Sequence, residues 1–351
     1  MPLDVMQRLS LILDWYKGMI RQETGRIAYT YDPLDDVAVF DDSAIRDIGS
    51  IWDVEVLSHF LGRPDMIRIV EGPLRRYVSD LIDRDGTLIL DPERLGEPPG
   101  IAHNAFMILS LLSSSLPDRD AKAMGLAAGI LRQQRGDGSY RIHFSEEPDS
   151  GIEFYPGEAM LALMETYAAT GDARYLESVE RGFACYRKVA PAPDLLVFHA
   201  NWQSQYAALL HRHTTSGRVR RAVRDYVFAL HDRILDARFY EEVERSPRQQ
   251  ATVEVACALE GVNDGYAITV HEGDQRRMRA YERCIRVALE YLFLAQRLED
   301  CTPRERGGFG HSLVDHTQRI DVTGHVASGF IKAARNGLAG ISCGDETRAA
   351  Q

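Results

Sequence analysis

The segment from Phe154 to Phe183, "FYPGEAMLALMETYAATGDARYLESVERGF", contains a helical hairpin, and hairpins of this kind recur along the chain. Apolar residues repeat at helical spacing on both sides of Gly171 and Asp172. A glycine is typical of a helix C-terminus and an aspartate of a helix N-terminus. In each hairpin the first helix is the more apolar and the return helix the more charged. This difference distinguishes inner from outer helices in a layered all-α protein.

The apolar helices predict six inner helices that begin near residues 46, 101, 155, 199, 248 and 321. The last inner helix has almost no chain left for a return helix, and the amphipathic N-terminal helix "DVMQRLSLILDWYKGMIRQE" has no partner. Packing these two helices together closes a double ring of six inner and six outer helices. We therefore expect one all-α domain over residues 1–340, followed by a flexible tail at residues 341–351.

Four glycine-containing segments follow predicted outer helices, and their short alternating patterns predict small β-hairpins. These segments are "QETGRIAYTY", "DRDGTLIL", "QQRGDGSYRIHF" and "RGGFGHSL". Because each precedes an inner helix or lies close to one, we expect the hairpins to cap one rim of the ring.

Composition excludes several classes of function. The net charge of −11 is spread along the chain and argues against a nucleic-acid partner. No apolar run is long enough to span a membrane, and the N-terminus does not have the pattern of a secretory signal. The five cysteines include no C-x-x-C pair, so we expect a reduced, cytoplasmic setting. The sequence has no glycine-rich phosphate loop, and we expect no cofactor.

The hairpin pattern resembles the α/α toroid, the double ring shared by six-hairpin glycosidases, sugar 2-epimerases and, in related form, terpenoid cyclases. The "YPGE" step ending at Glu158 is similar to the Pro-Gly-His step of the N-acylglucosamine 2-epimerase family, with the glutamate in place of the histidine and on a different hairpin. In that family, histidines on the fourth and sixth inner helices form the acid/base pair. The resemblance implies this role for His199 and His325. The glycine-aromatic strands are similar to the Gln-Trp repeats of class II terpenoid cyclases, but they lack the tryptophan, and the Asp-x-Asp-Asp motif is absent.

In a toroid all inner helices begin at one end of a central funnel, so polar residues at the helix starts are the candidate site residues. The candidate catalytic residues are Glu260, Glu158, Asp321, His325, His199 and Tyr155. The candidate substrate-binding residues are Arg46, Asp47, His103, Asn104, Trp202, Gln203 and Arg319. Each of these has a structural alternative, as a helix cap or as a satisfied core residue.

Two of these positions carry a specific chemical argument. Glu260 lies inside an apolar helix, where burial would raise the pKa of its carboxyl group and suit it to general acid catalysis. The alternative is an ion pair with Arg319 or Arg46. Asp321 and His325 are four residues apart on one helix face, so the carboxylate can orient the imidazole as a base. The alternative is a surface pair.

The preferred hypothesis is a carbohydrate-active enzyme that uses acid/base proton transfer, either a glycoside hydrolase or a sugar epimerase. The alternatives are a terpenoid-cyclase-like cyclase or lyase, and a non-catalytic toroid that binds a glycan or peptide. Six helix N-termini and two arginines at the rim favour an anionic sugar. A metal site formed by His103, His199 and His325 is conceivable, but no ligands have the close spacing of a metal motif, and we expect no metal. Substrate identity and oligomeric state stay open.

Overall fold

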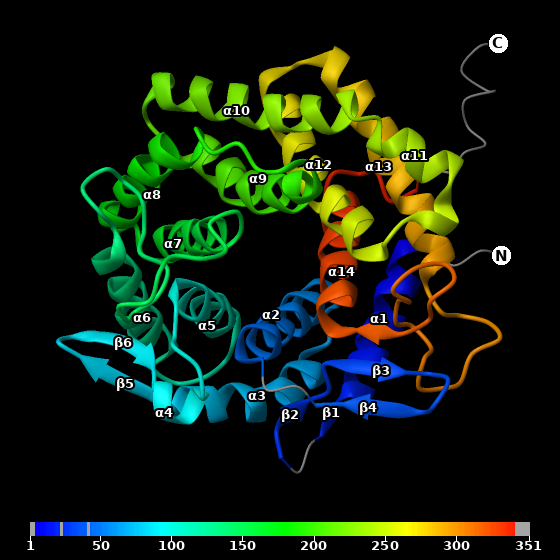
Figure 1. Ribbon diagram of the computed structural model, residues 1–351, viewed down its shortest axis with the longest axis horizontal. Coiled ribbons are helices and arrows are strands. Elements are labelled where there is room, and N and C mark those ends of the chain that lie inside the picture. The colour runs from blue at the N-terminus through cyan, green and yellow to red at the C-terminus, as the bar shows by residue number, and fades with distance from the viewer. Residues whose placement is uncertain (1–3, 22–23, 41–42, 341–351) are drawn as a thin grey trace.

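The computed structural model describes residues 4–21, 24–40 and 43–340, and within them six inner helices surround a central axis (Figure 1). The inner helices are α2 (Ala44–Leu61), α5 (Ile101–Ser113), α7 (Tyr155–Thr170), α9 (Leu196–His213), α12 (Thr252–Glu272) and α14 (Ile320–Arg335). Each packs against the next, and α14 packs against α2, so the inner ring is closed. The tail expected at residues 341–351 lies outside the described residues.

An outer layer of helices covers this ring. The outer helices are α1 (Val5–Met19), α3 (Pro64–Ser79), α6 (Arg119–Gln133), α8 (Ala173–Tyr186), α10 (Gly217–Asp236) and α13 (Gln275–Ala295). The N-terminal helix α1 contacts both α2 and α14. It is fastened there by two hydrogen bonds of 2.7 Å, from the Tyr16 hydroxyl to the Ile320 carbonyl and from Trp15 Nε1 to Gln318 Oε1. The predicted (α/α)6 double ring is confirmed. That residues 1–340 form a single domain stays a proposal.

The hairpin of α7 and α8 shows why the sequence alternates between two kinds of helix. Gly171 ends α7 in the left-handed conformation with φ 72°, and the Asp172 side chain then caps α8 by accepting from the Arg174 backbone N–H. Side chains on all sides of α7 are buried, because neighbouring inner helices and the outer layer surround it. Helix α8 buries one stripe, including Tyr175, Val179 and Phe183, and exposes its charged face.

The helix starts agree closely with the predictions, apart from local differences. Helix α9 begins at Leu196 rather than near 199 because the 3₁₀ turn η1 (Pro193–Leu195) leads directly into it. Before α12, the 3₁₀ turn η2 (Pro247–Gln249) is followed by extended backbone at Gln250, which delays the helix start to Thr252. The short helices α4 (Pro92–Leu95) and α11 (Phe239–Arg245) were not predicted.

Short antiparallel strands stand in the chain between outer helices and the starts of inner helices, and they lie at the edge of the ring beside α1, α3 and α6 (Figure 1). The strands are β1 (Ile20–Arg21), β2 (Arg26–Ile27), β3 (Thr30–Asp32), β4 (Val37–Val39), β5 (Leu81–Arg84), β6 (Thr87–Leu90) and β7 (Gln318–Arg319). The first two predicted glycine segments contribute to these hairpins. The segments near residues 133–144 and 306–313 form isolated bridges instead, such as the pair of Gln134 and Tyr140.

None of the helices in the described ranges has the length and apolar character that crossing a membrane requires.

Candidate active site in the central cavity

A cavity of about 450 Å³ opens at the N-terminal ends of the inner helices. Eight of the sequence-predicted residues line it: Arg46, Tyr155, Glu158, Trp202, Glu260, Arg319, Asp321 and His325. The structure therefore brings together side chains from α2, α7, α9, α12 and α14. The common direction of the inner helices produces this convergence, because it places all their first turns at the same end.

A contact between opposite charges inside the cavity joins Glu260 to His325. His325 Nδ1 lies 2.6 Å from Glu260 Oε2, and Asn201 donates a hydrogen bond of 2.9 Å to the same oxygen. Burial by itself disfavours both charges, but Cys257 and Glu260 outweigh it and raise the pKa of His325 well above its ordinary value. The facing His325 likewise outweighs burial and lowers the pKa of Glu260. The pair is an imidazolium and a carboxylate.

This pairing corrects the sequence analysis on Glu260. The prediction of a raised pKa at Glu260 is wrong, because the carboxylate does not stand alone in the apolar helix but is paired with His325. The alternative partners, Arg319 and Arg46, are wrong as well, since the cation that faces Glu260 is His325.

The predicted orientation of His325 by Asp321 is also wrong. Asp321 instead forms a two-point contact with Arg319, whose Nε lies 3.0 Å from Asp321 Oδ1, and Arg46 Nε lies 4.0 Å from the same carboxylate. Both guanidinium groups also stack over the Tyr29 ring, with the Arg46 Cζ at 4.6 Å and the Arg319 Cζ at 5.4 Å from its centre. Two arginines and one carboxylate therefore form a charged group at the cavity wall.

Two further carboxyl groups in the cavity, Glu158 and Asp53, keep their protons at neutral pH. Burial raises the pKa of Glu158 to about 8, and its Oε2 has no hydrogen-bond partner within the structure. Burial, aided by the neighbouring Glu260, raises the pKa of Asp53 to about 8 as well, although His325 opposes the shift. The cavity thus holds carboxyl groups in two protonation states.

Asp53 was missed by the sequence analysis because it lies in the third turn of α2, beyond the helix start. Its signal was the spacing of Arg46, Ser50 and Asp53 along one helix face. A Cβ atom at position 324 would lie 1.9 Å from Asp53 Oδ2, so Gly324 of α14 provides the space for this carboxyl group. Glycine at 324 is thus part of the site architecture.

Aromatic side chains form the apolar wall of the cavity. Trp202 packs edge-on against both Phe106 and His325, with ring centres 5.8 Å apart in each case. The other aromatic residues of the wall are Trp52, Phe154, Tyr155 and Phe198. An apolar face beside a few convergent polar groups is the usual composition of a small-molecule site, and aromatic faces suit the apolar faces of sugar rings.

Two predicted residues of α9 do not line the cavity. His199 is fully buried between the Glu153 carbonyl, 3.1 Å from Nδ1, and the Tyr226 hydroxyl, 3.2 Å from Nε2. Gln203 accepts hydrogen bonds from the Tyr226 hydroxyl and from its helix neighbour Tyr206. Successive side chains of an α-helix point about 100° apart. Gln203, next to the cavity-lining Trp202, therefore faces another helix.

The predicted residues Asp47, His103 and Asn104 also face away from the cavity. Asp47 accepts a hydrogen bond of 2.9 Å from Tyr77 of α3. His103 lies 3.3 Å from Glu97 and accepts from the Gly100 backbone N–H. Asn104 donates to backbone carbonyls of Leu88 and Leu126. These hydrogen bonds connect the inner helices to the outer layer and to the rim. The hydrogen-bond partners of Asp47, His103 and Asn104 therefore lie outside the central cavity. The conceivable cluster of His103, His199 and His325 does not form.

One set of potential metal ligands occurs in the cavity. Cys257, which the sequence analysis did not select, has its sulfur within 4.8 Å of ligand atoms of Glu260 and His325. A metal ion would require His325 to release its proton, and the pairing with Glu260 opposes that release.

Several solved structures have the same architecture, and the structural match extends over nearly the whole chain. No protein-family model matches the sequence, and no curated protein matches it. In structure, the chain is similar to an unsaturated glucuronyl hydrolase specific for heparin (TM-score 0.67, 9% identity, 95% of this chain and 97% of that chain covered). It is also similar to a sugar epimerase from a ruminal bacterium (TM-score 0.65, 14% identity, 96% of this chain and 98% of that chain covered). A D-mannose isomerase is similar as well (TM-score 0.68, 10% identity, 95% of this chain and 97% of that chain covered).

The chain therefore has the α/α toroid fold of these solved structures, as predicted from the hairpin pattern. The chain spans the full ring of these structures. At identities of 9% to 14% this likeness defines the fold, and the reaction has to be argued from the site.

Proposed function

We propose that this protein is a carbohydrate-active enzyme that hydrolyses a glycosidic bond by acid/base catalysis in the central cavity. The observation that carries the proposal is the difference in protonation between Glu158 and Glu260, which line the same cavity. Burial raises the pKa of Glu158 to about 8, whereas His325 overcomes burial and lowers the pKa of Glu260. Glycoside hydrolysis uses one protonated and one ionised carboxyl group on opposite sides of the scissile bond.

The roles follow from these protonation states. Glu158 is the proposed general acid, which protonates the leaving-group oxygen as the glycosidic bond breaks. Glu260 is the proposed ionised partner, which activates water or stabilises the positive charge that develops on the sugar ring. His325 holds Glu260 in its ionised form and fixes its position through the 2.6 Å contact. Asp53, also protonated, is the second candidate for the acid.

Hydrolysis is favoured over epimerisation by the position of His199. The epimerase hypothesis needs two histidines that exchange protons with one substrate carbon, and only His325 lines the cavity. His199 is satisfied by the Glu153 carbonyl and the Tyr226 hydroxyl on the other side of α9. A carbocation cyclase is less favoured, because the three cations Arg46, Arg319 and His325 line the cavity and would repel a carbocation.

We further propose that the sugar is anionic. Three cations line the cavity, Arg46, Arg319 and His325, and they face the two carboxylates of Glu260 and Asp321. With the remaining acids protonated, the cavity has an excess of one positive charge within a protein of net charge −11. The N-termini of the inner helices add partial positive charge at the same end. A sugar carboxylate would offset this excess.

A panel of aryl glycosides tests the proposal, with each hexuronide compared with its parent hexoside. We expect hydrolysis of at least one hexuronide and a lower rate for the matched hexoside. Glu158→Gln should lower the rate by at least about 100-fold. Glu165→Gln is the matched control, because Glu165 also lies on α7 and is half-buried but does not line the cavity. An active Glu158→Gln variant, or conversion of free sugars without hydrolysis, would contradict the proposal.

A further inference from the structure

A cluster of metal-binding side chains lies at the opposite end of the ring from the cavity. His211 is in the last turn of α9, and His271 and Glu272 are in the last turn of the neighbouring helix α12. One ligand atom of each residue lies within 4.8 Å of the other two. Position 271 is fourteen residues beyond Cys257 on α12, which corresponds to about 20 Å along the helix axis. The cluster is thus independent of the proposed active site.

The arrangement of the three side chains resembles a partly assembled ligand set. His211 Nε2 lies 3.0 Å from Glu272 Oε1, and the imidazole rings of His211 and His271 are nearly perpendicular with centres 5.1 Å apart. Ligands of a tetrahedral zinc ion at about 2.1 Å are about 3.4 Å from one another. Small side-chain rotations therefore bring these three atoms to coordinating positions.

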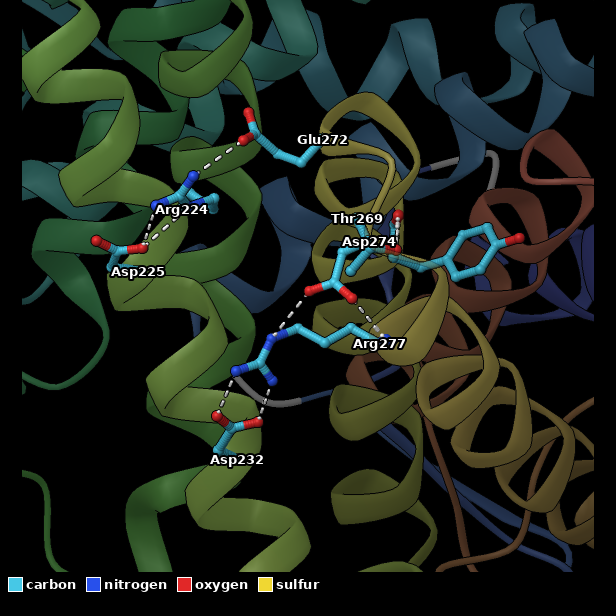
Figure 2. A network of polar contacts seen from close by, with 8 residues as sticks. Arg224, Asp225, Asp232, Thr269, Glu272, Asp274 and Arg277 are labelled. Atoms are coloured by element: carbon cyan, nitrogen blue, oxygen red, sulfur yellow. Dashed lines mark hydrogen bonds and ion pairs between the residues drawn. The ribbon is translucent and has the colours of Figure 1, made fainter.

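The three side chains of the cluster differ in how deeply they are buried and in which neighbouring residues hold them in place. His211 is only 2% exposed, so packing holds its ring in place, whereas His271 and Glu272 are accessible to an ion from solvent. Arg224 of α10 donates a hydrogen bond of 3.1 Å to Glu272 Oε2, and Asp225 partly balances its charge (Figure 2). This contact orients the carboxylate and leaves Oε1 directed at His211, as supporting residues do around metal ligands.

The helix ends add a favourable field. Both α9 and α12 terminate here, and a helix C-terminus attracts a cation through its partial negative charge. Imidazole and carboxylate together are ligands typical of zinc and related transition metals, whereas magnesium and calcium prefer oxygen alone. We infer that His211, His271 and Glu272 form a binding site for a divalent transition metal such as Zn²⁺, with water as a fourth ligand. The ion would connect two adjacent inner helices.

Zinc titration of metal-stripped, full-length protein tests this inference. Isothermal titration calorimetry should give one Zn²⁺ per chain for the wild type. His271→Ala, an exposed position that tolerates truncation, should weaken binding by at least about 100-fold. His213→Ala is the matched control, because His213 lies two residues from His211 and packs against Tyr167 instead. Zn²⁺ should raise the melting temperature of the wild type and of this control, but not that of His271→Ala.

Cys257→Ser separates this site from the cluster of Cys257, Glu260 and His325 in the cavity. The variant should retain zinc binding, and the cobalt-substituted wild type should show no sulfur-to-cobalt charge-transfer band. Loss of binding in Cys257→Ser, wild-type affinity in His271→Ala, or no binding by the wild type would each overturn the inference.

Discussion

Replacing Glu158 by glutamine should stabilise the protein at neutral pH while it removes activity. Burial raises the pKa of Glu158 from 4.5 to about 8, so the folded protein keeps a proton that the unfolded chain releases. At pH 7 this difference destabilises the folded state by about 3 kcal/mol. Glutamine has the same shape and does not ionise. We therefore expect the variant to gain about this amount, and several degrees in melting temperature.

The dependence on pH identifies the cause. For a carboxyl group with a raised pKa, the unfolded state binds fewer protons between the two pKa values, so folding stability falls as pH rises from about 4.5 to about 8. The slope attributable to Glu158 is about 1.4 kcal/mol per pH unit in this window. Urea denaturation of the wild type and of Glu158→Gln at pH 5, 6, 7 and 8 measures the difference directly. Other groups with raised pKa values, such as Asp53, are present in both proteins and cancel.

Glu177→Gln is the control, because Glu177 is exposed on the outer helix α8. Its stability difference from the wild type should stay near zero at every pH. If the free-energy difference for Glu158→Gln is constant from pH 5 to pH 8, Glu158 does not have a raised pKa. Its assignment as general acid would then fail.

Three further changes examine other parts of the site. His325→Gln leaves Glu260 buried without its cation and should destabilise the protein by about 3–5 kcal/mol by urea denaturation. Because the pKa of His325 is raised above its ordinary value of 6.5, the stabilisation from its proton should be complete below about pH 6.5 and should decline as pH rises from there toward the raised pKa, where it is lost. Gly324→Ala places a methyl group against the Asp53 carboxyl and should cost about 1–3 kcal/mol and most activity. Gly72→Ala on the outer helix α3, where the added methyl group meets nothing within 4 Å, should leave activity unchanged. Arg319→Lys loses a planar two-point contact and should raise KM for a hexuronide by about 10-fold without affecting a hexoside; equal changes for both substrates would contradict recognition of the sugar charge.

The order of inner and outer helices could be predicted because it depends on local composition. An inner helix such as α7 is surrounded by protein and is apolar on all sides, whereas an outer helix such as α8 has one apolar stripe. Turn residues such as Gly171 then mark the boundaries. The unpaired N-terminal helix predicted ring closure by itself, and its contacts with α2 and α14 confirm this. These features need no knowledge of distant contacts.

The contents of the cavity could be predicted only in part, for a physical reason. A helix that is apolar on all sides shows no preferred face, so its sequence does not reveal which positions point to the central axis. Glu158 and Glu260 face the cavity, whereas His199 and Gln203 lie at comparable positions and face other helices. The rotation of each inner helix about its own axis is decided by its packing against the two neighbouring inner helices.

The electrostatic roles were decided by tertiary structure alone. Glu260 and His325 are 65 residues apart in the chain, and their 2.6 Å contact exists because α12 and α14 pack side by side. The contact lowers the pKa of Glu260, whereas the sequence predicts a raised pKa there. At Glu158, burial without such a partner raises the pKa instead. A pKa depends on the charges and solvent within a few ångströms, and for these residues that surrounding comes from distant parts of the chain. The sequence by itself therefore determined the ring and its rim, and the packing of its helices determined which acids carry a proton.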